Sequence, residues 1–190
     1  MLTFQSLSLR RGAKILLENV NLTIQPGERW GIVGRNGSGK SSLLALILGI
    51  RDKTGLHPDL GEISLPPQLA LSYVAQETPA VDRAAIDYVM DGDQELRQLQ
   101  QRLAQAEADD DGAKQAHLHA ELDTIDAYTA PARAARLMNG LGFSEVQMQT
   151  PVTAFSGGWR MRLNLAQALM CRSDILLLDE PTNQIGRAHV

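Results

Sequence analysis

Cysteine is almost missing from this sequence: Cys171 is the single cysteine among 190 residues. An internal disulfide therefore cannot form, which excludes a small disulfide-rich scaffold and fits a reducing cytoplasm. Long apolar runs are missing too, since the longest candidates, residues 43–48 and 175–178, are much shorter than a bilayer span. The first residues show no basic start followed by an apolar stretch, so no signal peptide is predicted. We expect a soluble, cytoplasmic protein.

An excess of basic residues is also missing. The chain has 18 Lys and Arg against 22 Asp and Glu, a formal net charge of -4. This balance argues against nonspecific DNA binding, although it leaves room for a local basic patch. With 44% apolar residues the chain can bury one substantial core. We therefore expect one domain with an excursion.

The most specific motif is Gly34-Arg-Asn-Gly-Ser-Gly-Lys40-Ser41, which reads G-x-x-x-x-G-K-S. It follows the apolar run 30–33, which belongs to a strand expected at 29–33, and it leads into the helical pattern 42–48. This is the context that a phosphate-binding loop requires. The glycines let successive N–H groups point at phosphate oxygens, and the helix N-terminus adds positive potential. A plain glycine turn with a solvated lysine is the weaker alternative. The expected nucleoside triphosphate site comprises Gly34, Asn36, Gly37, Ser38, Gly39, Lys40, Ser41 and Ser42.

Alternating apolar residues predict strands near residues 2–9, 20–24, 61–65 and 69–74. From about Ala84 the apolar period becomes helical, with two stripes on either side of the polar turn 109–112. The stripes predict an antiparallel helical hairpin that projects from the core. They consist of Leu96, Leu99, Leu103 and Ala106, then Leu118, Leu122 and Ile125.

A second motif lies near the end of the chain, where the apolar run 175–178 ends in Asp179 and Glu180. A buried parallel strand that delivers acids at its C-terminal end is where an α/β sheet places catalytic groups. Asp179 would hold Mg²⁺, and Glu180 would polarise an attacking water. Alone, such a run is often a strand entering a polar turn; the phosphate loop upstream makes that alternative weak.

Between these motifs, Ser156, Gly157 and Gly158 precede a helical pattern. A serine and two glycines at a helix start offer free N–H groups and close backbone approach, which suits an anion. An ordinary helix N-cap is the alternative, because serine is favoured there.

Together with Gln76 in Tyr-Val-Ala-Gln-Glu and Leu-Leu-Leu-Asp-Glu-Pro-Thr-Asn183, these motifs resemble the ATP-binding cassette superfamily. The resemblance is strongest to subfamily F, cytoplasmic proteins with two cassettes on one chain and no membrane domain. It covers residues 1–183 and implies an α/β P-loop NTPase fold of the cassette type. That fold would have an N-terminal antiparallel β portion and an inserted helical hairpin.

The resemblance also implies residue roles. Residues 34–42 resemble the Walker A loop, and Gln76 resembles the Q-loop glutamine that contacts Mg²⁺ and water. Ser156, Gly157 and Gly158 resemble the signature, which in this family meets the ATP held by the opposite cassette. Asp179 resembles the Walker B aspartate and Glu180 the catalytic glutamate. ATP and Mg²⁺ are the implied cofactors, the metal being held by Ser41, Gln76 and Asp179.

The hairpin at about 87–128 falls where subfamily F members carry an arm. Members of this subfamily bind the ribosome near the tRNA exit site, so the resemblance implies a ribosome and tRNA as partners, and a second cassette on the same chain. An enlarged cassette helical subdomain is the alternative for the hairpin. For the whole protein, the alternatives are the ATPase subunit of a membrane transporter and a DNA-repair ATPase.

Two departures from the family pattern stand out. Where many cassettes place an adenine-stacking aromatic residue, this chain has Arg10-Arg11-Gly12, although a guanidinium can also stack on a base. After Asn183 the pattern stops, and residues 184–190 read like a translated sequencing adapter. We expect a cassette over 1–183, incomplete at its C-terminus, followed by a non-native or frayed tail.

Overall fold

The computed structural model describes residues 1–52, 56–74 and 80–179. Contacts within the chain divide it into two compact units. Unit 1 comprises residues 1–71 and 173–179, and unit 2 comprises residues 72–172. The predictions for Gln76, Glu180 and the tail 184–190 lie outside the described residues.

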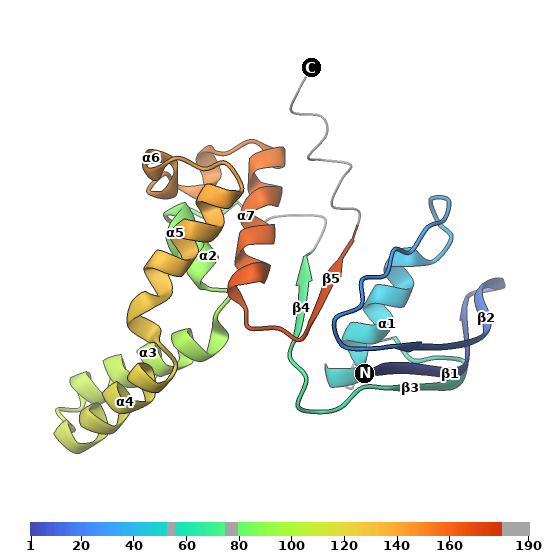
Figure 1. The fold of residues 1–190 in the computed structure, drawn as a ribbon, viewed down its shortest axis with the longest axis horizontal. Coiled ribbons are helices and arrows are strands. Elements are labelled where there is room, and N and C mark those ends of the chain that lie inside the picture. The colour runs from blue at the N-terminus through green and yellow to red at the C-terminus, as the bar shows by residue number, and fades with distance from the viewer. Residues whose placement is uncertain (53–55, 75–79, 180–190) are drawn as a thin grey trace. The chain divides into compact units, whose positions relative to one another are not determined.

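Unit 1 contains a three-stranded antiparallel sheet in the order β2-β1-β3 (Figure 1). Its strands are β1 (Leu2–Arg11), β2 (Lys14–Ile24) and β3 (Leu60–Ser64). The predicted alternation explains β1, since Leu2, Phe4, Leu7 and Leu9 are all buried. The spacing shifts between Phe4 and Leu7 because the register with both neighbours is interrupted there by a bulge. The N-terminal antiparallel portion is therefore formed as predicted.

Helix α1 (Lys40–Asp52) packs on the same core as β1. Its buried residues Leu44, Leu46 and Ile47 share this core with Leu177 of β5 (Ile175–Leu178). The helix that follows the glycine loop and the strand that precedes Asp179 are thus held by one apolar cluster.

A second, two-stranded sheet joins β4 (Leu71–Val74) and β5. The backbone N–H groups of Asp174 and Ile175 donate to the Ala70 carbonyl, and the Asp174 carboxylate accepts from the Ala70 N–H at 2.8 Å. Because these bonds join the residues that begin both strands, β4 and β5 run parallel, as the apolar run at 175–178 predicts.

The strand predicted at 29–33 is not formed. In the described residues this segment pairs with no other strand, and Trp30 and Val33 are 54% and 97% exposed. An apolar run becomes a buried strand only when a neighbouring strand offers hydrogen-bond partners and a face to cover it. The prediction from apolar content alone was therefore wrong for this structure.

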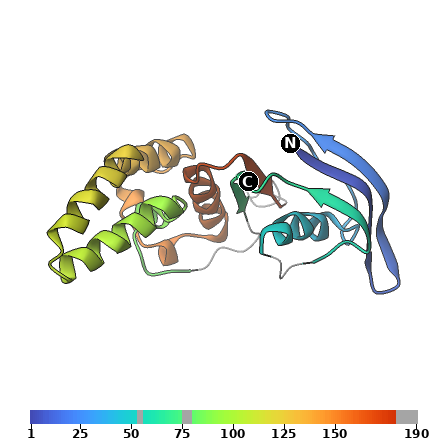
Figure 2. The same cartoon turned by 90° about the horizontal axis from the view of Figure 1, so that it is seen from below.

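Unit 2 is helical and has its own core (Figures 1 and 2). Apolar residues from nearly all its helices meet in one continuous cluster, which reaches from Ala85 to Met170. Its helices are α2 (Ala85–Met90), α3 (Gln94–Ala108), α4 (Gly112–Thr124), α5 (Ala130–Gly140), α6 (Glu145–Met148) and α7 (Gly157–Met170), with 3₁₀ turns Ala127–Thr129 and Val152–Ala154.

Helices α3 and α4 form the predicted antiparallel hairpin, and both views show it extending beyond the other helices of unit 2 (Figures 1 and 2). Two aspartates cap the two helices: the side chain of Asp93 accepts from the Leu96 N–H, and that of Asp111 from the Lys114 N–H. The apolar stripes of the hairpin are continuous with the core of unit 2. The apolar face of the hairpin is therefore part of that core and does not form a separate one.

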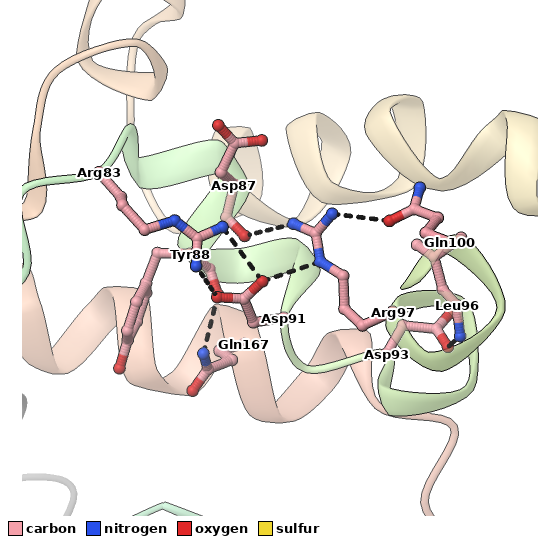
Figure 3. A network of polar contacts seen from close by, with 9 residues as sticks. All are labelled: Arg83, Asp87, Tyr88, Asp91, Asp93, Leu96, Arg97, Gln100 and Gln167. Carbon is pink, nitrogen blue, oxygen red and sulfur yellow. Dashed lines mark hydrogen bonds and ion pairs between the residues drawn. The ribbon is translucent and has the colours of Figure 1, made fainter. Parts of the chain in front are cut away.

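A polar network fixes the base of the hairpin to α2 (Figure 3). The Arg97 guanidinium on α3 donates to the Asp91 carboxylate at 2.8 Å and to the Asp87 carbonyl at 2.9 Å. Arg83 donates to the same Asp91 carboxylate at 2.7 Å. Arginine suits this position because its several N–H groups can bond two acceptors at once.

Helix α2 is in turn bound closely to α7. Gln167 of α7 donates its side-chain amide to the Tyr88 carbonyl at 2.8 Å, and the Tyr88 hydroxyl donates to the Asn164 amide oxygen. Burial, with a smaller contribution from the charge of Asp91, raises the pKa of the Tyr88 phenol. Gly92 lies so close that a side-chain Cβ there would overlap the Gln167 carbonyl. Only glycine allows this approach.

Candidate nucleotide-binding site

The glycine loop of unit 1 is a compact turn that opens into α1. The Ser38 N–H donates to the Arg35 carbonyl at 3.1 Å, and the Leu43 N–H donates to the Gly39 carbonyl at 2.9 Å. Gly37 and Gly39 have positive φ angles of 74° and 104°, which explains why glycine occupies these two positions. The predicted residues 34–42 therefore form one continuous loop and helix start.

Lys40, the first residue of α1, curls back over this loop. Its ammonium donates to the carbonyls of Gly34 at 2.9 Å and Arg35 at 3.3 Å. The ammonium therefore lies at the loop itself, which is where the terminal phosphates of a nucleotide would be bound. Ser41 follows on the helix, with its side chain exposed.

Strand β2 supports the same loop, which the sequence analysis missed. Lys14 donates its ammonium to the Gly37 carbonyl at 2.7 Å. Leu16 lies against Gly39, where a Cβ would come within 3.0 Å of the Leu16 Cβ. The two side chains share a face of β2 because they are two residues apart. The apolar alternation of β2, whose first residues lie beside the loop, was the available signal.

The segment before the loop is ordered by one carboxylate. Glu28 accepts from the Gln25 N–H at 2.9 Å and from the Trp30 indole N–H at 3.0 Å. These two hydrogen bonds, the backbone one first, lower the pKa of the Glu28 carboxyl. They close the turn at Pro26 and Gly27 on the way to the loop.

Asp179 directly follows β5 and is buried, with 4% of its surface exposed. Its carboxylate and the Ser41 hydroxyl are the oxygen donors that Mg²⁺ prefers, and Mg²⁺ in nucleotide sites takes its remaining ligands from phosphates and water. In the described part of the chain, no three His, Cys, Asp or Glu side chains gather as a metal site of their own. The Asp179 carboxylate and the Ser41 hydroxyl fit a metal ion whose other ligands come from a nucleotide and water.

The serine–glycine motif lies in unit 2 at the start of α7. Ser156 is the N-cap residue, its carbonyl accepts from the Arg160 N–H at 2.9 Å, and its side chain makes no capping hydrogen bond. Ser156 and Gly157 are exposed, and a Cβ added at Gly157 would meet no atom within 4 Å. The hydroxyl and the first N–H groups of α7 are thus available to an anion. The sequence alternative of an ordinary serine cap does not hold for this side chain.

Aromatic packing holds the first turn of α7 in place. Trp159 packs edge-on against Phe143, with ring centroids 4.8 Å apart, and the Arg162 guanidinium lies 4.7 Å from the Trp159 ring centre. Arg162 also donates to the Leu141 carbonyl at 3.3 Å. This end of the helix is therefore fixed relative to the rest of unit 2.

A family model described as "ABC transporter" matches residues 17–183, from β2 to the end of the Asp179 motif. The chain belongs to the ATP-binding cassette family. The loop at 34–42, residues 156–158 and Asp179 all lie within the matched range.

Two named proteins are similar to this chain in sequence. The cassette is 53% identical over 185 residues to "Probable ATP-binding protein YheS" of Escherichia coli, and 37% identical over 182 residues to human "ATP-binding cassette sub-family F member 3". The second of these relatives is named as a subfamily F protein. The two matches cover 97% and 92% of the cassette but 28% and 24% of the relatives, so the chain spans about a quarter of the length of either protein.

Solved structures agree on the fold. "Structure of ATP binding subunit of ABC transporter" matches with a TM-score of 0.64 at 19% identity, covering 97% of the cassette and 68% of that chain. "An inward-facing conformation of a putative metal-chelate type ABC transporter" matches with a TM-score of 0.62 at 21% identity, covering 97% and 61%. The α/β cassette fold predicted from the motifs is thereby confirmed. Among the described residues, no helix combines the length and apolar character needed to cross a membrane.

Proposed function

We propose that this cassette binds Mg·ATP and is one of two cassettes in a cytoplasmic ATPase that acts on the ribosome. The observation that carries the nucleotide part is the Walker A loop, in which two positive-φ glycines and Lys40 lie at the start of α1. Ser41 and Asp179 would hold the metal, which would neutralise phosphate charge. Gln76 and Glu180 are proposed as the residues that position and polarise the attacking water.

Hydrolysis requires more than this half-site. In the proposed composite site, the phosphates lie between the Walker A loop of one cassette and the signature of another, so Ser156 to Gly158 would act on ATP bound elsewhere. In addition, the segment 29–33 before the loop has no strand beside it in the described residues. A catalytic group displaced by about 1 Å can lose on the order of a hundredfold in rate. The 190-residue chain is expected to bind ATP better than it hydrolyses it.

Phosphate release tests this expectation. We expect turnover far below one per second, with little difference between the chain and its Glu180→Gln variant. Turnover near one per second that Glu180→Gln abolishes would instead show that the chain assembles a working site alone, contradicting the composite arrangement.

The ribosome part of the proposal depends on the α3–α4 hairpin acting as the arm of subfamily F. A shortened arm is best designed in the full-length protein by deleting residues 101–107 and 113–119. Seven residues make nearly two helical turns, so the remaining side chains keep their faces. This deletion retains Asp91, Asp93 and Arg97, which anchor the hairpin base.

Co-sedimentation with ribosomes is the measurement. We expect the full-length protein to pellet with ribosomes and the shortened variant to remain largely in the supernatant, because the arm no longer reaches its contacts. The control is Arg102→Ala with Glu121→Ala, which removes a 3.1 Å ion pair inside the hairpin without changing its length. If the shortened variant pellets with ribosomes as the full-length protein does, the arm proposal is wrong. If the full-length protein itself remains in the supernatant, the ribosome proposal is wrong.

A further inference from the structure

Two further cationic residues, Arg11 and Lys14, lie at the turn between β1 and β2, and this turn is next to the glycine loop. Arg11 and Lys14 flank the turn and are directly opposite each other in the antiparallel register. Directly opposed residues on paired strands share a face of the sheet, so both side chains lie on the face from which Lys14 reaches Gly37. The ammonium of Lys14 is thus a cation at the phosphate loop besides Lys40.

The Lys14 ammonium has capacity left for a ligand. It carries three N–H donors, and one of them is used by the Gly37 carbonyl. In the part of the chain that the structure describes, no carboxylate forms an ion pair with Lys14 or with Arg11. Both side chains are exposed, so an anion can approach them.

The pairing of Arg11 with Lys14 also places two positive charges opposite each other. Like charges directly opposite on neighbouring strands repel and destabilise the pair. An anion bound between them and the loop would relieve this repulsion, and a phosphate group of a nucleotide is the anion that the loop itself is shaped to bind.

We infer that Lys14 is a second phosphate-binding cation of this nucleotide site, supported by Arg11. This inference rests on the proposed ATP binding and adds residues outside the Walker A motif to it. Leu16, two residues further along β2, lies against Gly39, so this strand contacts the loop at a second point beside Lys14. The group that Lys14 would bind is the phosphate chain of the nucleotide. Inorganic tripolyphosphate has such a chain but no nucleoside, so it tests this contact separately from recognition of the base.

Two substitutions separate charge from loop support. Lys14→Gln keeps a donor for the Gly37 carbonyl but removes the charge, whereas Lys14→Met removes both. By titration calorimetry, we expect both variants to bind Mg·ATP and tripolyphosphate about tenfold more weakly, about the effect of one lost charge-assisted hydrogen bond. Lys14→Arg is expected to stay within about threefold of the wild type, because it keeps the charge.

Matched controls come from the same chain. Lys114→Met removes one positive charge from an exposed site on α4 and is expected to leave binding unchanged. Arg11→Gln is expected to weaken tripolyphosphate binding about threefold, whereas Arg10→Gln, on the other face of β1, is expected to leave the binding of this base-free probe unchanged.

The outcomes distinguish this inference from the proposed function. If wild type binds ATP and Lys40→Ala does not, but Lys14→Met binds like wild type, the inference is overturned and the proposed function stands. If Lys14→Gln binds normally while Lys14→Met does not, Lys14 only supports the loop and the phosphate contact is refuted. If wild type binds neither ATP nor tripolyphosphate, the proposed function fails and the inference fails with it.

Discussion

Replacing Lys40 with alanine is expected to weaken Mg·ATP binding by about a hundredfold or more. The Lys40 ammonium lies at the loop carbonyls of Gly34 and Arg35, where the terminal phosphates would be bound. Its removal takes away a charge-assisted contact and leaves neighbouring carbonyl oxygens facing phosphate oxygens without a cation between them. Titration calorimetry on the 190-residue chain measures the loss.

Lys114→Ala is the matched control, because it removes the same side chain from an exposed site in unit 2. The two variants have equal net charge. A difference in their ATP affinity is therefore due to the position of Lys40 and not to the overall charge of the protein. Equal ATP affinity of wild type and Lys40→Ala would refute the Walker A assignment as the binding site of this chain.

The second large effect is expected at the hairpin base, where Asp93→Ala should lower the free energy of unfolding of unit 2 by about 3–5 kcal/mol. Asp93 is 6% exposed; its carboxylate caps α3 at the Leu96 N–H and accepts from the Arg133 guanidinium of α5 at 2.7 Å. Without it, the largely buried Arg133 keeps a charge that no partner compensates, and its Nε atom already has no hydrogen bond in the described residues. Breaking one side of such a pair is costly because the remaining charge stays buried.

Asp111→Ala provides the control for capping alone. Asp111 caps α4 through the Lys114 N–H at 3.0 Å, much as Asp93 caps α3 at 3.1 Å, but it is exposed and has no cationic partner among the described residues. Loss of a cap costs about 1 kcal/mol. With Trp30 replaced by Phe, Trp159 becomes the only tryptophan and reports on unit 2 during urea unfolding. Equal losses for the two variants would show that the ion pair with Arg133 adds nothing.

The sequence predicted best where local chemistry decides the structure. The glycine loop, α7 after Ser156 and the short β5 all follow from residues close in the chain. The run 29–33 shows the limit of this reasoning, because its apolar content predicts a strand but says nothing about the partner that a strand needs.

Contacts between distant residues could not be predicted from local patterns. Lys14 and Gly37 are 23 positions apart, and Asp93 and Arg133 are 40 apart. In the sequence Lys14, Asp93 and Arg133 are ordinary charged residues. Their roles depend on the packing of β2 beside the loop and of α3 beside α5, which no single motif encodes.

The close approach of Gly92 to α7 has a mechanical consequence. Since α2 is hydrogen-bonded to α7 on one side and ion-paired to Arg97 of α3 on the other, we expect α7 and the hairpin to move together. Helix α3 has 15 residues, which correspond to about 22 Å at the helical rise. A rotation of roughly 10° about its base therefore sweeps the tip through about 4 Å, given that length. Small rotations of α7 would therefore become larger displacements at the far end of the hairpin, and a force on the hairpin tip would be transmitted to the start of α7 at Ser156.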